Sequence, residues 1–280
     1  MIVIDHVLFR YKKSKQKQFD DFCLNLGRGR VYGLLGKNGV GKSTLLYLMA
    51  GLLAPQKGKV WMDGTDVFRR LPATLREVFL VPEQFELPAV SLNRYIELNA
   101  PFYPRFDREK LETYLRDFDM DTELHLGALS MGQKKKVLIS FALAADTSLL
   151  LMDEPTNGLD IPAKSQFRKI IASGMNDDKT IVISTHQVRD IDKLLDHVVI
   201  LDTNRLLFDR GVDQISSKLH FCESGLHEPT GDALFVQPSL YGNSMLIAAG
   251  GREDTGSQLN LELLFNAVLA DPGKINRLFE

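Results

Sequence analysis

A glycine-rich loop between an apolar run and a helical pattern is the feature that most restricts what this chain can fold into. The apolar run covers residues 31–35, and the loop reads Gly-Lys-Asn-Gly-Val-Gly-Lys-Ser from Gly36 to Ser43. It fits G-x-x-x-x-G-K-[ST] at every fixed position, so Lys42 is expected to reach the β and γ phosphates and the Ser43 hydroxyl to bind Mg²⁺. Glycines let backbone N–H groups surround a phosphate, and the following helix presents its positive end to the same anion. The sequence therefore predicts a nucleoside triphosphate site that includes Gly36, Asn38, Gly39, Gly41, Lys42 and Ser43.

The composition narrows the partners that such a chain would have. Its 280 residues suffice for one large domain or two modest ones, and a formal net charge of −2 argues against nucleic acid as the main partner. The two cysteines, Cys23 and Cys222, lack a metal-type spacing, which fits a reducing cytoplasm. No signal-peptide pattern opens the chain, and no apolar run approaches the ~20 residues of a membrane-spanning helix. Any function at a membrane is therefore expected to depend on a partner.

Polar side chains follow three apolar runs that are typical of buried parallel strands. Residues at the carboxyl ends of such strands meet the ligand in an α/β sheet. Asp153 and Glu154 follow the run at 148–152, so one carboxylate is expected to hold Mg²⁺ and the other to orient or deprotonate water. His186, after the run at 180–184, is expected to contact a phosphate. The residues after the run at 78–81, Glu83 to Glu86, remain open between a ligand contact and a solvated loop.

The stretch from 91 to 146 has a helical period and few strand signals. Helices are predicted over 91–98, 108–118 and 131–145, which indicates a helical insert in the sheet domain. Ser130 and Gln133 match a capping box at the start of the third helix, and a helix start with a small glycine is also suited to receive a phosphate. The lysines at 134–136 are interpreted as a solvated face.

Strand patterns dominate the N-terminal region, and the pattern loosens toward the C-terminal end. Paired strands are predicted over 2–11 and 19–26 and over 197–201 and 205–209, with a further strand at 58–62. Tyr11 is either a half-buried strand aromatic or a ring that stacks on a base. From about residue 211, strand-like runs at 234–236 and 245–249 precede a helix over 259–269 with Asn260 as a possible cap. No chemical motif is found there, so this end is expected to be a packing or regulatory appendage.

Taken in order, these motifs resemble those of an ATP-binding cassette (ABC) ATPase. The loop, Leu129–Gln133, Leu149–Glu154, Asn157–Asp160 and His186 are similar to the family's Walker A, signature, Walker B, D-loop and H-loop. The resemblance implies an α/β fold: a P-loop NTPase core with a mixed, mainly parallel sheet, an antiparallel β subdomain, a helical subdomain and a small C-terminal α+β extension. The implied division is 1–215 as nucleotide-binding domain, with a helical subdomain at about 88–146, and 216–280 as an accessory region.

The resemblance also implies a role for each motif residue. Lys42, Ser43 and Thr44 would hold phosphates and Mg²⁺, Asp153 would support Mg²⁺, and Glu154 would act on the attacking water. His186 would touch the γ-phosphate. Ser130 and Gly132, with Gln133, would clamp ATP held by a second copy, Asp160 would link the two sites, and Tyr11 would stack on adenine. The family's Q-loop glutamine has no direct match, because Glu83 follows Pro82 and Gln84 comes one residue later. Glu83, or alternatively Gln84, would be a metal ligand. Met131 replaces a common signature glycine.

The implied function is the ATP-hydrolysing subunit of a bacterial exporter-type ABC transporter. Its partners would be an integral membrane permease and a second ABC subunit, with a homodimer expected, and it would lie at the cytoplasmic face of the membrane. The resemblance to exporter-type cassettes in particular rests on Phe102–Asp107 and the pattern Leu261-Glu262-x-x-Phe265. The alternatives are a soluble ABC ATPase that acts on ribosomes or DNA and a small-molecule kinase. A GTPase is disfavoured because no Asn-Lys-x-Asp motif is present.

Overall fold

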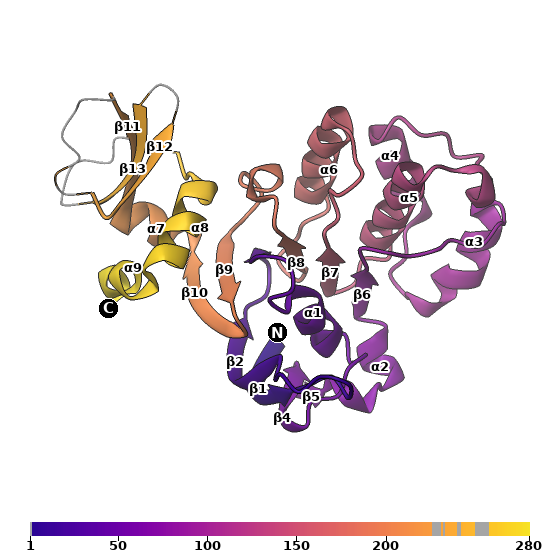
Figure 1. Cartoon of the computed structure of the whole chain (residues 1–280). Coiled ribbons are helices and arrows are strands. Elements are labelled where there is room, and N and C mark those ends of the chain that lie inside the picture. Colours follow the sequence, from indigo (N-terminus) through magenta and orange to yellow (C-terminus); the bar gives the residue numbers. More distant parts are fainter. Residues whose placement is uncertain (1, 226–230, 232, 240–241, 250–257) are drawn as a thin grey trace.

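The computed structural model describes residues 2–225, 231, 233–239, 242–249 and 258–280. Its strands are β1 (Ile2–Phe9), β2 (Phe19–Leu26), β3 (Val31–Leu35), β4 (Lys57–Met62), β5 (Thr65–Asp66), β6 (Val78–Val81), β7 (Leu149–Asp153), β8 (Thr180–Thr185), β9 (His197–Asp202), β10 (Arg205–Gly211), β11 (Leu219–Ser224), β12 (Phe235–Ser239) and β13 (Gly242–Ala248). Its α-helices are α1 (Lys42–Met49), α2 (Pro72–Leu75), α3 (Leu92–Asn99), α4 (Arg108–Asp117), α5 (Met131–Ala144), α6 (Ile161–Ser173), α7 (Val212–Lys218), α8 (Leu261–Ala270) and α9 (Pro272–Asn276). In Figure 1 the helices α3–α5 lie at one end of the molecule and β11–β13 at the other.

The central sheet carries the site, and its strand order is β10-β9-β3-β8-β7-β6. Every neighbouring pair is parallel except β9 and β10, which are antiparallel. The strands β3, β7 and β8 are buried along their whole length. Covered on both faces, such strands need apolar side chains at successive positions, which explains the continuous apolar runs in the sequence. The predicted mixed, mainly parallel sheet is confirmed.

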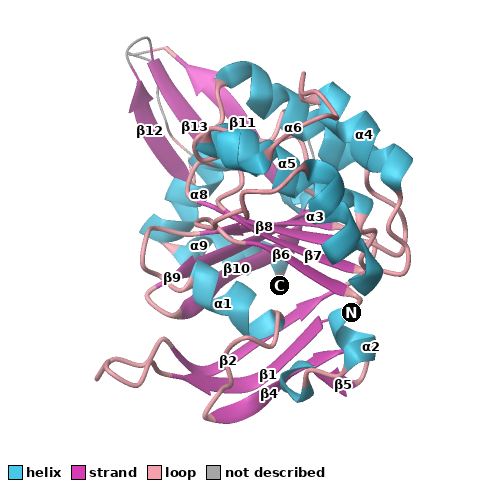
Figure 2. Cartoon of the chain, turned by 90° about the vertical axis from the view of Figure 1, so that its right-hand side faces the viewer, coloured by secondary structure: helices cyan, strands magenta, loops and turns pink. Residues whose placement is uncertain are grey.

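Successive residues of the central strands contribute to two separate cores. Leu149 and Leu151 of β7 belong to the core around α1, whereas Leu150 and Met152 of the same strand belong to the core beneath the other helices. This alternation is the period-two arrangement of a pleated strand. Figure 2 shows α1 between the central sheet and a second, antiparallel sheet with the order β2-β1-β4-β5. The loop before α1 is therefore held between two sheets.

The helical insert packs against the free edge of the central sheet at β6. Helix α5 contacts both β6 and α4, and its residues from Val137 to Ala144 are all buried. Four aromatic rings surround Phe141 at centroid distances of 5.0–6.2 Å: Phe79, Tyr95, Tyr103 and Phe106. The three predicted helices are confirmed, and none of their ends differs from the prediction by more than one residue.

The C-terminal end forms a three-stranded antiparallel sheet, β11-β13-β12, with α7, α8 and α9 beside it. The predicted final helix is α8, and the side chain of Asn260 caps it by accepting a hydrogen bond from the Leu263 amide at 3.0 Å. The strand-like runs are parts of β12 and β13, whereas β11 was not predicted, since its pairing with β13 is a long-range contact. The first strand ends at Phe9 and not at Tyr11, because the Gln18 amide closes the hairpin on the Phe9 carbonyl at 2.8 Å.

None of the helices in the described part of the chain combines the length and the apolar character that crossing a membrane would require.

Candidate functional site

The glycine-rich loop joins β3 to α1, and two of its glycines, Gly36 and Gly41, occupy positions where a side chain would not fit. Gly41 has φ +108°, and a Cβ there would lie 2.7 Å from Gln18 Nε2 and 3.0 Å from Phe19 Cζ. A Cβ on Gly36 would lie 2.8 Å from the Leu201 carbonyl oxygen. Gly41 is also the N-cap of α1 and supplies no side-chain hydrogen bond to the helix. The first amides of α1 are therefore left for an anion, as helix N-termini favour.

A pocket of about 350 Å³ opens at this loop. The residues that line it come from the loop, the hairpin before β2 and the carboxyl ends of the central strands: Gln18, Asn38, Gly39, Gly41, Lys42, Ser43, Thr44, Glu83, Glu154 and His186. The predicted phosphate-loop residues and the predicted polar residues after three separate strands thus meet in one place. This is the arrangement expected of a ligand site at the carboxyl edge of an α/β sheet.

Lys42 is the cation of the pocket and is only 5% exposed. Its Nζ donates hydrogen bonds to the carbonyl oxygens of Gly36 at 2.8 Å and Lys37 at 3.2 Å, and it lies 3.6 Å from Glu154 Oε1. Burial lowers the pKa of Lys42, and the negative charge of Glu154 acts in the opposite direction. A phosphate that enters the pocket would meet a buried ammonium group that is already held toward the loop.

Asp153 ends β7 and Glu154 follows it, and the two buried carboxylates have different partners. Asp153 is 1% exposed and accepts a short hydrogen bond from the Ser184 hydroxyl on β8. Glu154 is 5% exposed, and its Oε1 accepts hydrogen bonds from the His186 amide at 3.1 Å and from His186 Nδ1 at 2.8 Å. Because a carboxylate only accepts, this geometry puts the His186 proton on Nδ1 and leaves Nε2 free to accept a hydrogen bond. The two carboxylates are thus held in place separately.

The Glu154 backbone adopts a left-handed conformation, with φ +44°. Such a conformation is uncommon for a residue other than glycine and requires support from its surroundings. The support comes partly from backbone hydrogen bonds: the Glu154 amide donates to the Ser184 carbonyl at 3.0 Å, and the Asn157 amide donates to the Glu154 carbonyl at 3.2 Å. The chain therefore turns sharply where the carboxylate enters the pocket.

Tyr11 lies beside the loop and not among the residues that line the pocket. The residue is 41% exposed, and its ring packs edge-on against Phe9 with centroids 5.0 Å apart. Its hydroxyl forms a hydrogen bond of 2.9 Å with the Thr44 hydroxyl at the start of α1. The sequence left a strand aromatic and a stacking ring open, and the exposed ring at the loop is compatible with stacking.

Of the two residues considered for the Q-loop position, Glu83 lies on the pocket and Gln84 does not. The Glu83 Oε1 atom accepts a hydrogen bond from Asn157 Nδ2 at 3.2 Å. Asn157 Oδ1 in turn accepts one from Gln187 Nε2 at 3.0 Å. The segments after β6, β7 and β8 are thus joined by side-chain hydrogen bonds at the edge of the pocket.

The Ser130–Gln133 segment is not part of this pocket. The predicted capping box is present: Ser130 Oγ accepts from the Gln133 amide at 3.3 Å, and Gln133 Oε1 accepts from the Ser130 amide at 3.0 Å. Ser130, Met131 and Gln133 are exposed. Asp160 is also exposed and caps α6 through the Ala163 amide at 2.8 Å. The structure therefore gathers the loop, the two carboxylates and His186, but leaves the signature residues on the outer surface.

The comparisons with known proteins agree with this set of motifs. Residues 19–157 match the family model described as ABC transporter. The ABC transporter ATP-binding protein NatA of Bacillus subtilis (strain 168) is 29% identical over 216 residues, which cover 74% of this chain and 87% of that protein. The bacitracin transport ATP-binding protein BcrA of Bacillus licheniformis is 30% identical over 73% of this chain and 68% of its own length. The chain belongs to the ABC transporter family of ATP-binding proteins.

The fold of this ABC ATPase is confirmed by a solved structure of an ATP-binding subunit of an ABC transporter. The two superpose with a TM-score of 0.67 and 25% identity, covering 77% of this chain and 91% of the other. The P-loop NTPase core, the antiparallel β subdomain and the helical subdomain that the sequence predicted are all present. The small-molecule kinase alternative is thereby replaced by an ABC ATPase.

Sequence reasoning missed several residues of this ABC ATPase site, of which Lys135 is the most informative. The prediction of a solvated face at 134–136 is wrong for Lys135, which is 3% exposed. The helical spacing could have predicted its burial. Leu138, Ile139 and Ala142 lie three, four and seven residues later, on the same face of the helix, and all are buried. Gln18, which lines the pocket, and Ser184, which binds Asp153, carried no such signal, since only the tertiary fold brings them to the loop and to β7.

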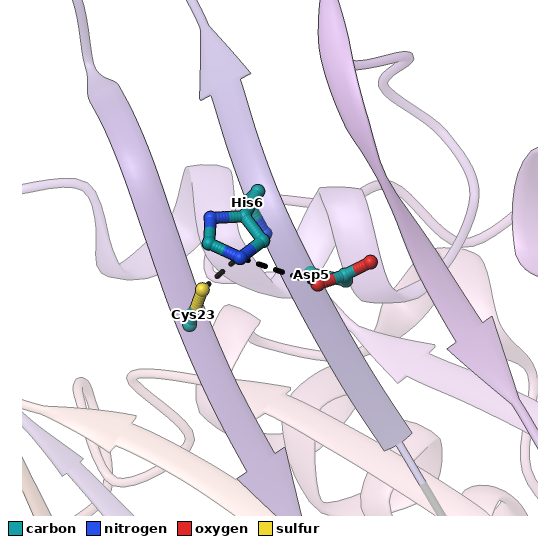
Figure 3. Close-up of side chains that lie close together, drawn as sticks. All are labelled: Asp5, His6 and Cys23. Carbon is teal, nitrogen blue, oxygen red and sulfur yellow. Dashed lines mark hydrogen bonds and ion pairs between the residues drawn. The ribbon is translucent and has the colours of Figure 1, made fainter.

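A second group of polar side chains lies on the antiparallel β subdomain of the ABC ATPase, away from the pocket. One ligand atom each from Asp5, His6 and Cys23 lies within 4.8 Å of the others (Figure 3). All three residues are exposed, and none of them lines the pocket. The His6 Nδ1 atom is hydrogen-bonded to Asp21 at 2.6 Å, and this bond raises the pKa of His6. The group is thus a hydrogen-bonded feature of the surface between β1 and β2.

Proposed function

We propose that this ABC ATPase powers export through a separate membrane permease, and that ATP drives the pairing of two copies of the chain. In this proposal residues 1–215 form the nucleotide-binding domain, with the helical subdomain at about 88–146, and residues 216–280 are accessory. The working unit is peripheral to the cytoplasmic face of the membrane. The observation that carries the proposal is the division of the site: a phosphate pocket on one surface and exposed signature residues outside it.

The phosphates of ATP fit the loop through backbone amides of Gly39 and Gly41, the Asn38 segment, and the start of α1. Lys42 would exchange its two carbonyl partners for phosphate oxygens. Thr44, already hydrogen-bonded to the Tyr11 hydroxyl, sets the distance between the first turn of α1 and the ring that would stack on adenine. These contacts supply positioning, which is the largest part of what phosphoryl transfer needs from a protein.

The residues present also fit a divalent cation bound with ATP. The Ser43 hydroxyl and the Glu83 carboxylate line the pocket, and the Asp153 carboxylate is 1% exposed at the adjacent strand end. These are oxygen ligands, the type that Mg²⁺ prefers. When bound, Mg²⁺ would neutralise charge on the β and γ phosphates. Gln84, which does not line the pocket, is the weaker candidate for this role.

Hydrolysis would use Glu154 and His186 together. Water attacks the γ-phosphorus, its proton passes to the Glu154 carboxylate, the bond from the γ-phosphorus to the bridging oxygen breaks, and ADP and phosphate leave. His186 donates from Nδ1 to Glu154 at 2.8 Å, which leaves Nε2 for a proton-bearing group at the γ-phosphate end. Lys42 Nζ lies 3.6 Å from Oε1 of the same carboxylate.

The second half of the site would come from another copy. Ser130, Gly132 and Gln133 form the start of α5, and the helix N-terminus and the exposed hydroxyl suit a γ-phosphate. They do not line the pocket of their own chain, so a second copy is needed to bring them to ATP. Asp160, exposed at the start of α6, lies on the segment that would face the second copy. A homodimer satisfies both sites with one sequence.

An apolar groove supports a permease as the other partner. It lies between the segment 70–80 and the turn after α3, and Leu52, Leu75 and Phe102 are large side chains exposed along it. Two arginines, Arg70 and Arg76, also line it. Such a groove suits a short amphipathic segment with an acidic end, which would transmit closure of the dimer to the membrane protein.

Two experiments test the proposal: the ATP-dependent dimerisation of the chain, and the co-purification of a membrane protein with it. In light scattering, Glu154→Gln is expected to be dimeric with ATP and monomeric with ADP, whereas Glu154→Gln combined with Ser130→Arg stays monomeric while it still binds ATP. From detergent-solubilised membranes, a tagged chain is expected to retain one integral membrane protein, which is lost with Phe102→Asp. Transport of a substrate outward, measured in cells that contain both proteins, would establish direction. Co-purification with ribosomes or DNA in place of a membrane protein, or an ATP-independent dimer, would contradict the proposal.

A further inference from the structure

Lys135 is a buried cation on the same helix that begins with the signature residues. It is 3% exposed, and its Nζ donates to the carbonyl oxygens of Asn157 at 2.8 Å and Glu154 at 3.2 Å. A buried ammonium group is unfavourable unless hydrogen bonds and opposite charges surround it. Both of these acceptors belong to the turn that follows β7, which is the turn that directs the Glu154 carboxylate.

The backbone of that turn explains why such a cation is useful. Glu154 has φ +44°, a conformation that places its carbonyl oxygen in the turn and not in the β7 ladder. The carbonyl accepts from the Asn157 amide and from Lys135, so the lysine holds the two ends of a four-residue turn, residues 154–157, at once. Burial lowers the pKa of Lys135, and the negative charges of Glu83, Glu154 and Asp153 act in the opposite direction.

The same turn touches the start of α5 at a second point. A Cβ on Gly132 would lie 3.1 Å from the carbonyl oxygen of Gly158, which directly follows the 154–157 turn. Gly132 and Lys135 are three residues apart and thus on one side of α5. The first turns of α5 and the segment 154–158 therefore pack together, and a displacement of the helix start would be passed to the Glu154 backbone.

We propose that Lys135 is a positioning residue that connects the signature end of α5 to the backbone of Glu154. When Ser130–Gln133 engage ATP held by a second copy, this connection fixes the Glu154 carboxylate in the pocket of their own chain. Each copy would thus set its catalytic geometry only when its signature is occupied. The inference rests on the proposed function, because it requires the nucleotide-bound pair.

The test compares neighbouring lysines of one helix. Lys135→Met removes both hydrogen bonds to the 154–157 turn. Lys136→Met is the matched control, because Lys136 Nζ donates to the Phe118 carbonyl at 3.2 Å and lies over the Phe118 ring, within the helical subdomain. We expect Lys135→Met to lower kcat by about 10- to 100-fold, the usual range for the loss of a supporting hydrogen bond, with KM for ATP nearly unchanged. Lys136→Met should retain the kcat of the unmodified chain.

A double variant separates positioning from general damage. If Lys135 acts through Glu154, then adding Lys135→Met to Glu154→Gln should lower kcat no further, whereas a structural defect would lower it again. Lys135→Arg, which keeps the charge and the donors, should recover part of the lost kcat. If Lys135→Met does not fold by circular dichroism, Lys135→Gln replaces it. The side chain of glutamine is shorter and lacks the ammonium group that bonds both carbonyls, so a lower kcat is again expected.

Different results would contradict the ATP-dependent pairing of two copies and the positioning role of Lys135. Glu154→Gln that stays monomeric with ATP contradicts the paired working unit itself. If Glu154→Gln dimerises but Glu154→Gln with Lys135→Met does not, Lys135 serves assembly and the positioning role is wrong. A Lys135→Met protein with unchanged kcat, or one that raises KM while kcat stays constant, would also overturn the inference.

Discussion

Gly41 and Glu154 both have positive φ values at the pocket, but for opposite reasons. At Gly41 a side chain would collide with Gln18 and Phe19, so only glycine fits the close approach of loop and hairpin. At Glu154 the side chain is the functional part, and the unfavourable backbone is held by Lys135, Asn157 and Ser184. Backbone strain at such a site persists only when neighbouring groups support it.

Gly41→Ala is expected to weaken ATP binding by about tenfold or more, because strain of about 1–3 kcal/mol at this φ adds to the contact with Gln18. Equilibrium titration with a fluorescent ATP analogue measures the change. Gly64→Ala is the control: Gly64 has φ +77°, but a Cβ there meets nothing within 4 Å and the residue is not part of the pocket. Equal loss of affinity in both variants would show that general destabilisation, and not the loop, is responsible.

Glu154→Gln is expected to bind ATP with nearly unchanged affinity while kcat falls by about 10²- to 10⁴-fold, the usual contribution of a general base. The amide keeps the size of the carboxylate but does not accept a proton from water. Phosphate release under saturating ATP, together with a binding titration, gives both quantities. Full turnover in this variant would refute the assignment of Glu154 as the base.

Some residues of this site could be predicted from the sequence, and others could not. Lys42, Ser43 and Glu154 were predicted because each lies within a short motif whose spacing alone defines its geometry. Lys135 was misinterpreted because its neighbours in sequence are lysines, and its acceptors lie 19 and 22 residues away. Gln18 reaches the loop only through hairpin packing against α1, so no local pattern carries that information.

At the scale of elements, α5 is positioned by aromatic packing around Phe141. This ring is fully buried among Phe79, Tyr95, Tyr103 and Phe106, which come from β6, α3 and the loop that follows α3. Phe141→Ala is expected to lower the free energy of unfolding by about 3–5 kcal/mol, the usual range for deleting a core aromatic. Urea denaturation followed by circular dichroism measures it. A loss below about 1 kcal/mol would mean that the cluster is not what holds the helical subdomain to β6.

A second link between the helical insert and the sheet depends on pH. Arg105 donates two hydrogen bonds to Glu77, at 2.9 and 2.6 Å, and this pairing lowers the pKa of Glu77 below its usual 4.5. A carboxyl whose pKa is lower in the folded state stabilises the fold above pH 4.5, and this contribution disappears as the pH falls through the folded-state pKa. We therefore expect the difference in Tm between the unmodified chain and Glu77→Gln to shrink below that pH. A constant difference from pH 7 to pH 3 would contradict the assignment.

At the scale of the whole molecule, the C-terminal helix α8 shares a core with the central sheet. Leu261, Leu264 and Val268 of α8 belong to the same buried cluster as Val198 and Ile200 of β9 and as the residues beneath α5. Arg189, which follows His186 in the chain, also forms an ion pair with Glu262 of α8. The sequence indicated a loosely patterned appendage, because strands such as β11 depend on pairing with β13, which no local pattern reveals.

If this shared core makes one cooperative unit, a substitution in α8 should destabilise the whole molecule. Leu264 is fully buried on α8, so Leu264→Ala is expected to lower the free energy of unfolding by about 2–5 kcal/mol. Trp61, the single tryptophan, lies on β4 in the sheet beyond α1, far along the chain from Leu264. If both cores unfold together through the central sheet they share, Trp61 fluorescence and far-ultraviolet circular dichroism should shift to the same lower urea midpoint in the variant. An unchanged Trp61 midpoint beside a lowered circular dichroism midpoint would show that residues 216–280 unfold independently, and that the shared core does not couple them to the ATPase.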